Sequence, residues 1–93
     1  MEEIKEKLRK IKNIVFTKHA EQQLILREGN KEQIQNLIKN PENLIYSETQ
    51  KNRECLYFNI SNKRTIILPV VFKNKTLYIL TYIMRYRPWR RKR

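Results

Sequence analysis

The sequence contains a single cysteine, a single histidine and a single glycine, and it has no aspartate. With only Cys55, the chain cannot form an internal disulfide or a zinc site built from pairs of cysteines. Its only acidic side chains are nine glutamates that are not spaced as ligands, so we expect neither a metal nor a cofactor. No apolar run reaches the length of a signal peptide core or a membrane span. We therefore expect a cytoplasmic protein that makes no contact with a membrane.

Positive charge is in large excess. The chain has 21 Lys and Arg against nine Glu, which gives a formal charge of +12 and calls for an anionic partner. Residues 85–93 carry six of these net charges. An apolar content of 40% argues against a disordered basic tail and allows a core, while 93 residues leave room for one domain. We predict a single domain over 1–93 with a basic carboxyl-terminal tail at 85–93.

Apolar periodicity predicts helices first and strands afterwards. Residues 2–12 have a helical stripe, Thr17 is placed to cap a second helix that ends near a left-handed Gly29, and Asn30 is placed to cap a third. From Leu44 onward the period is two, which predicts strands at 44–46, 54–60, 64–72 and 76–84. Pro69 predicts a bulge or a locally unpaired edge. We expect an α+β domain whose N-terminal helices pack on one face of a sheet of three or four antiparallel strands.

Aromatic rings lie among the arginines of the tail. Tyr86 and Trp89 stand beside Arg85 and Arg87, and rings that stack on bases next to guanidinium groups that pair with phosphates are what single-stranded RNA binding requires. We assign RNA binding to Tyr86, Arg87 and Trp89. The last four residues, 90–93, we interpret as a solvated segment that adheres to any polyanion.

Two further arginines flank the strand predicted at 54–60. Arg53 precedes this strand and Arg64 follows the turn after it. They either line the same anionic surface, as RNA-binding residues, or protect strand edges from unwanted pairing.

Three side chains outside the tail are candidates for chemistry. His19 is the only group whose ordinary pKa lies near neutrality, although a lone histidine can equally be a capping or packing residue. Arg27 follows Ala20 by seven residues on the core-facing line, where it acts on a substrate, forms a salt bridge or snorkels over apolar surface. Tyr82 is predicted to share a face with Tyr78 and to lie close to the basic tail.

One set of motifs carries a family resemblance. Phe16-Thr17-Lys18-His19-Ala20, followed by Arg27, by Asn40-Pro41 and by Ile79-Leu80-Thr81-Tyr82, resembles small prokaryotic domains that open with a His-Ala helix and are grouped with the RelE/ParE-like toxins. The resemblance runs from about Ile14 to Arg87. It implies a compact α+β toxin, the RelE-like fold, that cleaves RNA without a metal, often on the ribosome. An antitoxin protein would neutralise it.

The resemblance also implies roles for individual residues. His19 would serve as base or acid, Arg27 would hold the phosphate, and Tyr82 would orient or protonate an oxygen, with Arg85 as a further catalytic cation. We therefore expect an endoribonuclease in which a ribose 2′-hydroxyl attacks the phosphate. It would be monomeric when active and oligomeric with its antitoxin. This hypothesis requires His19 and the carboxyl-terminal arginines to converge on one cleft.

Two other functions remain open at this point. One is an RNA-binding module without turnover, and the other is a ParE-like toxin that inhibits a protein target such as a topoisomerase.

Overall fold

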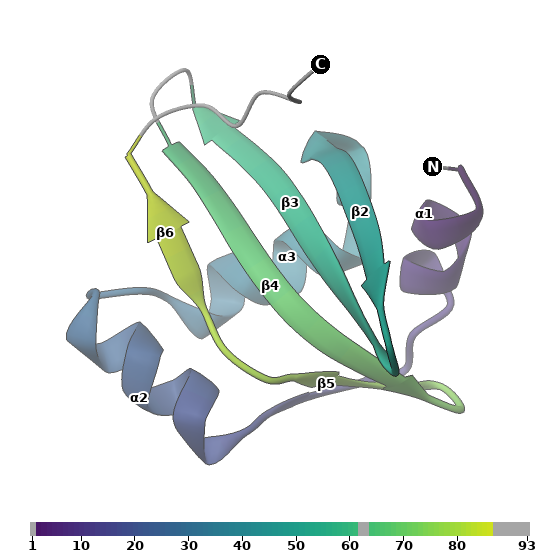
Figure 1. Ribbon diagram of the computed structural model, residues 1–93, viewed down its shortest axis with the longest axis horizontal. Coiled ribbons are helices and arrows are strands. Elements are labelled where there is room, and N and C mark those ends of the chain that lie inside the picture. The colour runs from purple at the N-terminus through teal and green to yellow at the C-terminus, as the bar shows by residue number, and fades with distance from the viewer. Residues whose placement is uncertain (1, 62–63, 87–93) are drawn as a thin grey trace.

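The structure is a computed structural model that describes residues 2–61 and 64–86. Arg87 and Trp89, to which RNA binding was assigned, lie outside these residues. Within the described part of the chain, no helix is long and apolar enough to cross a membrane. The elements, in chain order, are α1 (Glu2–Arg9), β1 (Asn13–Phe16), α2 (Lys18–Leu26), α3 (Lys31–Lys39), η1 (Pro41–Asn43), β2 (Leu44–Gln50), β3 (Arg53–Ser61), β4 (Arg64–Lys73), β5 (Thr76–Ile79) and β6 (Ile83–Arg85) (Figure 1).

The strands form one six-stranded mixed sheet. Its order is β1-β5-β4-β3-β2, and β6 pairs with β4 beyond the end of β5. β1 runs parallel to β5, whereas every other pairing is antiparallel. The prediction of N-terminal helices on three or four antiparallel strands is therefore wrong. The prediction failed because the apolar run Ile14–Phe16, which we did not assign to a strand, pairs with a segment more than sixty residues further along the chain. This strand also separates α1 from α2.

The last predicted strand is broken in two. β5 ends at Ile79 and β6 begins at Ile83, and on β4 neither strand pairs with Leu68 or Pro69. Proline has no backbone N–H, so it cannot donate to a partner strand. Its carbonyl accepts a hydrogen bond of 2.9 Å from the backbone N–H of Leu80. The locally unpaired edge predicted at Pro69 is confirmed.

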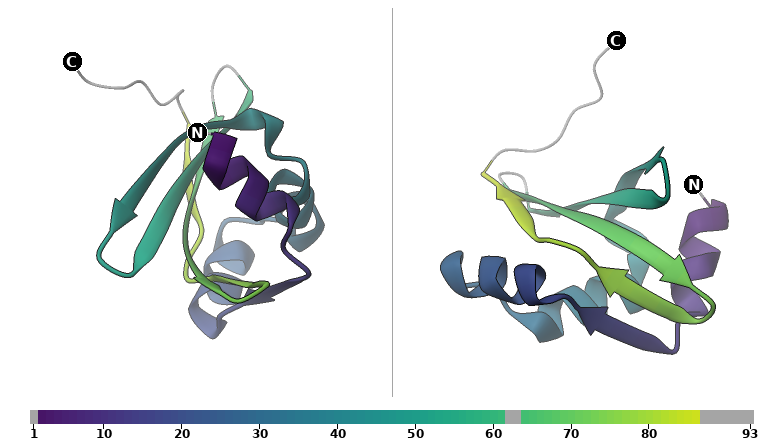
Figure 2. Two further views of the ribbon diagram at one scale, coloured as in Figure 1. Left: turned by 90° about the vertical axis from the view of Figure 1, so that its right-hand side faces the viewer. Right: turned by 60° about the horizontal axis from the view of Figure 1, so that its bottom comes forward.

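The helices leave one face of the sheet uncovered. Figure 2 shows α1 and α3 over one side of the curved sheet, with α2 on the same side beside β6. We call the opposite side the helix-free face. Because strand side chains alternate between faces, each strand sends one set of residues toward the helices and the other set to the helix-free face.

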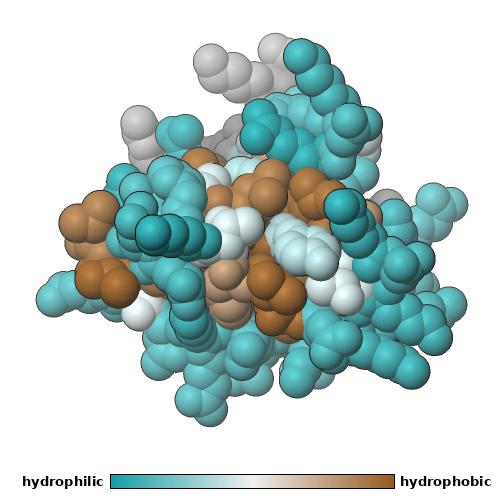
Figure 3. Space-filling model, turned by 90° about the horizontal axis from the view of Figure 1, so that it is seen from below, coloured by the Kyte–Doolittle hydropathy of each residue, from teal (hydrophilic) through white to brown (hydrophobic). Residues whose placement is uncertain are grey.

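The start of α2 is fixed to the connection between β5 and β6. The Thr17 hydroxyl accepts a hydrogen bond of 3.2 Å from the backbone N–H of Ala20 and donates one of 2.9 Å to the carbonyl of Leu80. The predicted cap is therefore confirmed, and it also anchors the helix. Only Ala20 and Leu24 of α2 are buried. Ile25 and Leu26 are 77% and 74% exposed, and Figure 3 shows apolar side chains at the margin of the molecule where α2 lies.

The end of α2 differs from the prediction. Glu28, not Gly29, adopts the left-handed conformation, with φ of 55°. The N–H of Gly29 bonds to the carbonyl of Leu24 at 2.6 Å and that of Glu28 bonds to Ile25 at 3.2 Å, the pattern of a Schellman motif. Gly29 is needed for space, because a Cβ at this position would lie 2.5 Å from Leu24 Cδ2.

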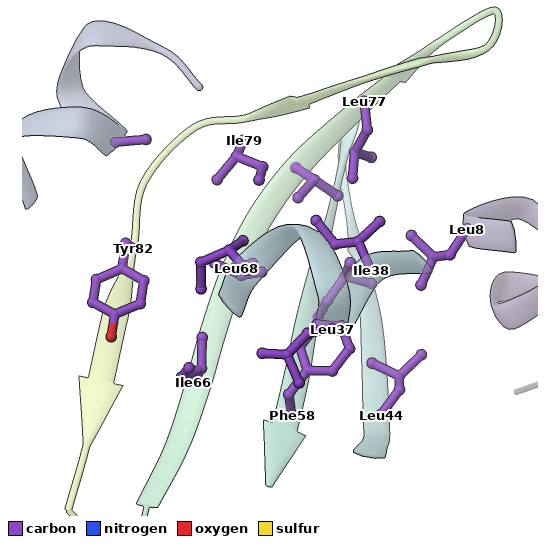
Figure 4. Packing of buried hydrophobic residues seen from close by; sticks show 14 of the residues in the cluster. Leu8, Leu37, Ile38, Leu44, Phe58, Ile66, Leu68, Leu77, Ile79 and Tyr82 are labelled. Atoms are coloured by element: carbon purple, nitrogen blue, oxygen red, sulfur yellow. The ribbon is translucent and has the colours of Figure 1, made fainter. Parts of the chain in front are cut away.

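The core lies between the sheet and the helices. Alternate residues of β3 and β4 meet apolar side chains of all three helices there (Figure 4). Its most buried members include Leu8, Leu24, Ile34, Ile38, Leu56, Phe58, Ile66, Leu68, Val70, Leu77 and Ile79. Each such side chain contributes about 1.5–3 kcal/mol of hydrophobic stabilisation. The core thus holds β4 rigidly and, through it, positions β6.

Candidate nucleic-acid interface

One group of candidate residues gathers around the β6 edge, on the helix side of the sheet. It consists of Arg27, Arg64, Tyr82 and Tyr86, and we call it the edge cluster. Tyr82 is its centre, with only 2% of its surface exposed. A Cβ built on Gly29 would lie 3.3 Å from Tyr82 Cζ, which shows that the ring packs under the connection between α2 and α3. Figure 4 shows the hydroxyl directed toward the carboxyl end of β6.

The electrostatics of Tyr82 show which groups surround its hydroxyl. Burial is the largest cause that raises the pKa of Tyr82, and the neighbouring Tyr86 phenol adds to it. Arg27 and Arg64 act in the opposite direction. Since the net pKa shift is upward, Tyr82 keeps its proton near neutral pH and can donate a hydrogen bond. Two cations from separate elements thus counteract the rise in the pKa of this phenol.

The two arginines belong to different elements. Arg27 is the C-cap residue of α2, and Arg64 is the first residue of β4. The Arg64 guanidinium carbon lies 5.7 Å from the centroid of the Tyr86 ring. Arg27 is exposed, so the prediction that it continues the core-facing side of the helix is wrong. The reason is that α2 ends at Leu26, so Arg27 is no longer part of the regular helix. Exposure leaves both guanidinium groups accessible to a phosphate.

His19 lies apart from the edge cluster. It is exposed, in the first turn of α2, two residues after the Thr17 cap. Eight residues separate it from Arg27, roughly 12 Å along the helix axis at about 1.5 Å per residue. Of the four residues assigned to catalysis, Arg27 and Tyr82 are the two with a described interaction, in which Arg27 counteracts the rise in the pKa of Tyr82.

Arg85 and Arg53 lie on the helix-free face. Arg85 is paired with Thr65 of β4, so the two side chains lie on the same face of the sheet. The Thr65 hydroxyl donates a hydrogen bond to Asn59 Oδ1. Asn59 follows the core residue Phe58 in β3, so this face is the one opposite the core. Arg53 is likewise in phase with the face opposite Phe58. The arginines predicted to share one surface are thus divided between the two faces of the sheet, Arg27 and Arg64 on one, Arg53 and Arg85 on the other.

The helix-free face also carries an aromatic pair that the sequence analysis missed. Tyr46 of β2 and Tyr57 of β3 are directly paired, with ring centroids 5.3 Å apart and ring planes inclined by 57°. Burial raises the pKa of Tyr57, with smaller contributions from Cys55 and Glu48, while Arg85 opposes them. Strands were predicted at 44–46 and 54–60, but the register that brings Tyr46 against Tyr57 is not visible in the sequence.

Tyr78 and Tyr82 do not share a face, contrary to the prediction. Ile79 and Tyr82 both belong to the core cluster, although three residues separate them. The irregular connection at Leu80 and Thr81 therefore changes the phase of the alternation, and Tyr78 is left on the helix-free face. This change of phase is what moves Tyr82 into the edge cluster.

The surface of the described residues has several hollows, one of which is lined in part by the candidate residue Arg53. One pocket of about 510 Å³ follows α3 and η1 and is lined mainly by Asn, Gln and Glu side chains, among them the cap residue Asn30 and Asn40 of the Asn40-Pro41 motif. Across residues 2–61 and 64–86, no three His, Cys or acidic side chains gather where they could hold a metal ion.

Comparison with protein-family models, with curated proteins and with solved structures finds no match to this chain.

Proposed function

We propose that the protein is an endoribonuclease that binds RNA at the β6 edge and cleaves it by attack of a ribose 2′-hydroxyl on the adjacent phosphate. The observation that carries this proposal is the edge cluster, in which Arg64 lies 5.7 Å from the Tyr86 ring and Tyr82 packs under the α2–α3 connection that follows Arg27. Two exposed guanidinium groups around one phenol are suited to a phosphodiester, whose oxygens accept charged hydrogen bonds. The net charge of +12 favours the same polyanionic substrate.

The side chains would divide the reaction among them. A base removes the 2′-hydroxyl proton, the oxygen attacks phosphorus, the bond to the 5′ oxygen breaks, and an acid protonates the leaving oxygen. Arg27 and Arg64 stabilise the charge on the phosphate oxygens. Tyr82, which keeps its proton, supplies the hydrogen bond or the proton. The products are a 2′,3′-cyclic phosphate and a 5′-hydroxyl.

His19 is the base in this proposal, which requires the RNA to reach both ends of α2. Its imidazole is exposed, but roughly 12 Å of helix separates its backbone from that of Arg27. RNA must therefore lie along α2 for one nucleotide to contact both the start of the helix and the edge cluster. The resemblance to RelE/ParE-like toxins adds the proposal that cleavage arrests growth until an antitoxin covers this surface.

One observation favours a second candidate, RNA binding without turnover. Tyr82 is almost fully buried, so its hydroxyl reaches a phosphate only if the substrate enters beside the α2–α3 connection. Exposed arginines at the edge would bind RNA in either case.

A cleavage assay separates the two candidates. A 5′-labelled RNA is incubated with the full chain in excess EDTA, and products are examined for a 2′,3′-cyclic phosphate. We expect cleavage that is lost in His19→Ala and reduced at least tenfold in Arg27→Gln. Arg9→Gln is the matched control, because it removes the same charge from a surface arginine that pairs with Glu6 on α1.

The outcomes are distinct. Intact RNA with a salt-sensitive mobility shift would replace the nuclease with the binding module. Equal cleavage by Arg27→Gln and Arg9→Gln would show that the edge cluster is not the site.

A further inference from the structure

A hollow of about 240 Å³ lies at the turn between β2 and β3, and we call it the turn hollow. It is bounded by Lys7 of α1, by Phe72 of β4 and by residues 51–53 of the turn and the start of β3. Figure 1 shows this turn at the end of the sheet away from β6. Eight residues of β4, about 26 Å at about 3.3 Å per residue, separate Phe72 from Arg64 of the edge cluster. The turn hollow is therefore a separate place on the molecule.

Three cations line the turn hollow. Lys7, Lys51 and Arg53 are all exposed, and neither of the two ion pairs found among the described residues involves them. Arg53 lines the hollow although its strand phase is that of the helix-free face, because it is the first residue of β3. The Lys7 ammonium lies 4.4 Å from the centroid of the Phe72 ring, a cation–π contact that holds it in place. A ligand therefore does not have to order this cation itself.

The charge of the turn hollow matches a particular kind of anion. Glu54 also lines it, and one oxygen of this carboxylate accepts a hydrogen bond of 2.7 Å from the Thr49 hydroxyl. Three cations against one carboxylate leave a net charge of +2. A phosphomonoester carries about −1.5 to −2 at neutral pH, whereas a phosphodiester carries about −1. The phosphomonoester is thus the closer match.

The side of the turn hollow toward α1 is less favourable for an anion. A second hollow adjoins it there and shares Lys7, Thr49 and Glu54 with it. This second hollow contains Glu3 in place of the other two cations. An anion is therefore attracted to the turn rather than to the groove along α1.

The backbone of the turn supports a role for the Lys51 side chain. Lys51 adopts the left-handed conformation, with φ of 51°, which glycine and asparagine adopt more readily than lysine. In the turn between β4 and β5, Asn74 has this conformation, with φ of 56°. In the β2–β3 turn the lysine has it, although Asn52 is the next residue. An unfavourable backbone conformation that is kept at one residue points to a function of that residue.

We propose that the turn hollow binds the phosphate group of a phosphomonoester, as a free nucleotide or the 5′ end of an RNA carries it. Lys7, Lys51 and Arg53 pair with the phosphate oxygens, and the side-chain amide of Asn52 donates a further hydrogen bond. This site goes beyond the proposed function and does not depend on it, because the turn hollow and the edge cluster share no residue.

Ligand pairs that differ only in one phosphate test the proposal. Adenosine 5′-monophosphate is compared with adenosine, and a short RNA with a 5′-phosphate is compared with the same RNA that ends in a 5′-hydroxyl. The RNA carries 2′-fluoro groups, so it cannot react by 2′-hydroxyl attack. Affinities for the full chain are measured by isothermal titration calorimetry. In at least one of the two pairs, we expect the phosphate to strengthen binding about tenfold, the effect of about one hydrogen bond between charged groups.

Matched variants assign this gain to the turn hollow. Lys51→Gly removes the charge and supplies the residue that adopts the left-handed conformation most readily, so it should stay folded in thermal melting and lose most of the gain. Lys7→Gln should lose it likewise. Arg9→Gln removes a charge from the same helix outside the hollow, and Arg27→Gln removes one from the edge cluster, so both should keep the gain.

The outcomes identify the ligand or reject the site. A gain confined to the RNA pair assigns the site to the 5′ end of an RNA, and a gain in the nucleotide pair assigns it to free nucleotides. Equal affinities within both pairs overturn the proposal, as does a gain that survives in Lys51→Gly and Lys7→Gln or that is lost equally in Arg9→Gln. RNA that stays intact while the gain is present rejects the nuclease and leaves this site standing.

Discussion

Replacement of Tyr82 separates its part in packing from its part in chemistry. Tyr82→Phe keeps the ring among the core residues and removes only the hydroxyl. We expect the free energy of unfolding to change by less than about 0.5 kcal/mol. Cleavage, in contrast, should fall by about a hundredfold or more if the phenol is the acid.

Tyr82→Ala should damage the fold itself. A buried tyrosine covers about 150–250 Å². At about 25 cal/mol per Å² this burial is worth about 4–6 kcal/mol as an upper bound, and aromatic-to-alanine changes in cores cost about 3–5 kcal/mol. A domain of this size has only about 5–15 kcal/mol in total. The alanine variant should therefore lose a large part of its stability.

Urea unfolding at two pH values provides the measurement. Because the folded state raises the pKa of Tyr82 above its ordinary value of 10.0, the stability that this group contributes is present below pH 10.0 and is lost as the pH rises through the folded pKa. The wild type should therefore lose more stability than Tyr82→Phe between neutral pH and about pH 11. The reasoning is refuted if Tyr82→Phe unfolds as readily as Tyr82→Ala, or if it cleaves RNA at the wild-type rate.

Two local features of α2 give further predictions. Thr17→Ala should reduce stability by about 1–2 kcal/mol in urea unfolding, because it removes the helix cap and the bond to Leu80, whereas Thr17→Ser should recover most of it. Gly29→Ala should cost about 1–3 kcal/mol in the same measurement, because its Cβ would crowd Leu24 Cδ2 at 2.5 Å and Tyr82 Cζ at 3.3 Å; an unchanged unfolding midpoint would show that both neighbours move aside freely.

Features that depend on neighbours in the sequence were predictable. Thr17 and Asn30 cap the helices to which the sequence assigned them, since a cap is formed by residues within one turn. The period of two over 54–60 likewise predicted a strand, and β3 spans Arg53–Ser61. Local side-chain chemistry decides each of these features.

Features that depend on distant pairing were not predictable. A run as short as Ile14–Phe16 becomes a strand only because β5 is available beside it, and nothing within the run encodes that partner. The Tyr46–Tyr57 contact similarly depends on the register of β2 against β3, which shifts between Leu44 and Tyr46. A local pattern cannot reveal such a bulge.

The division of the candidate site follows from one irregular connection. An unbroken strand over 76–84 would put Tyr78 and Tyr82 on one face, as the sequence pattern predicted. The change of phase at Leu80 and Thr81 instead turns Tyr82 into the core, and the alternation of β6 then places Arg85 on the side opposite Tyr82. The short edge strand β6 therefore has Arg85 on the helix-free face, while Tyr82 and Tyr86 lie on the helix side. This is why the candidate residues are divided between the edge cluster and the helix-free face, which share no residue.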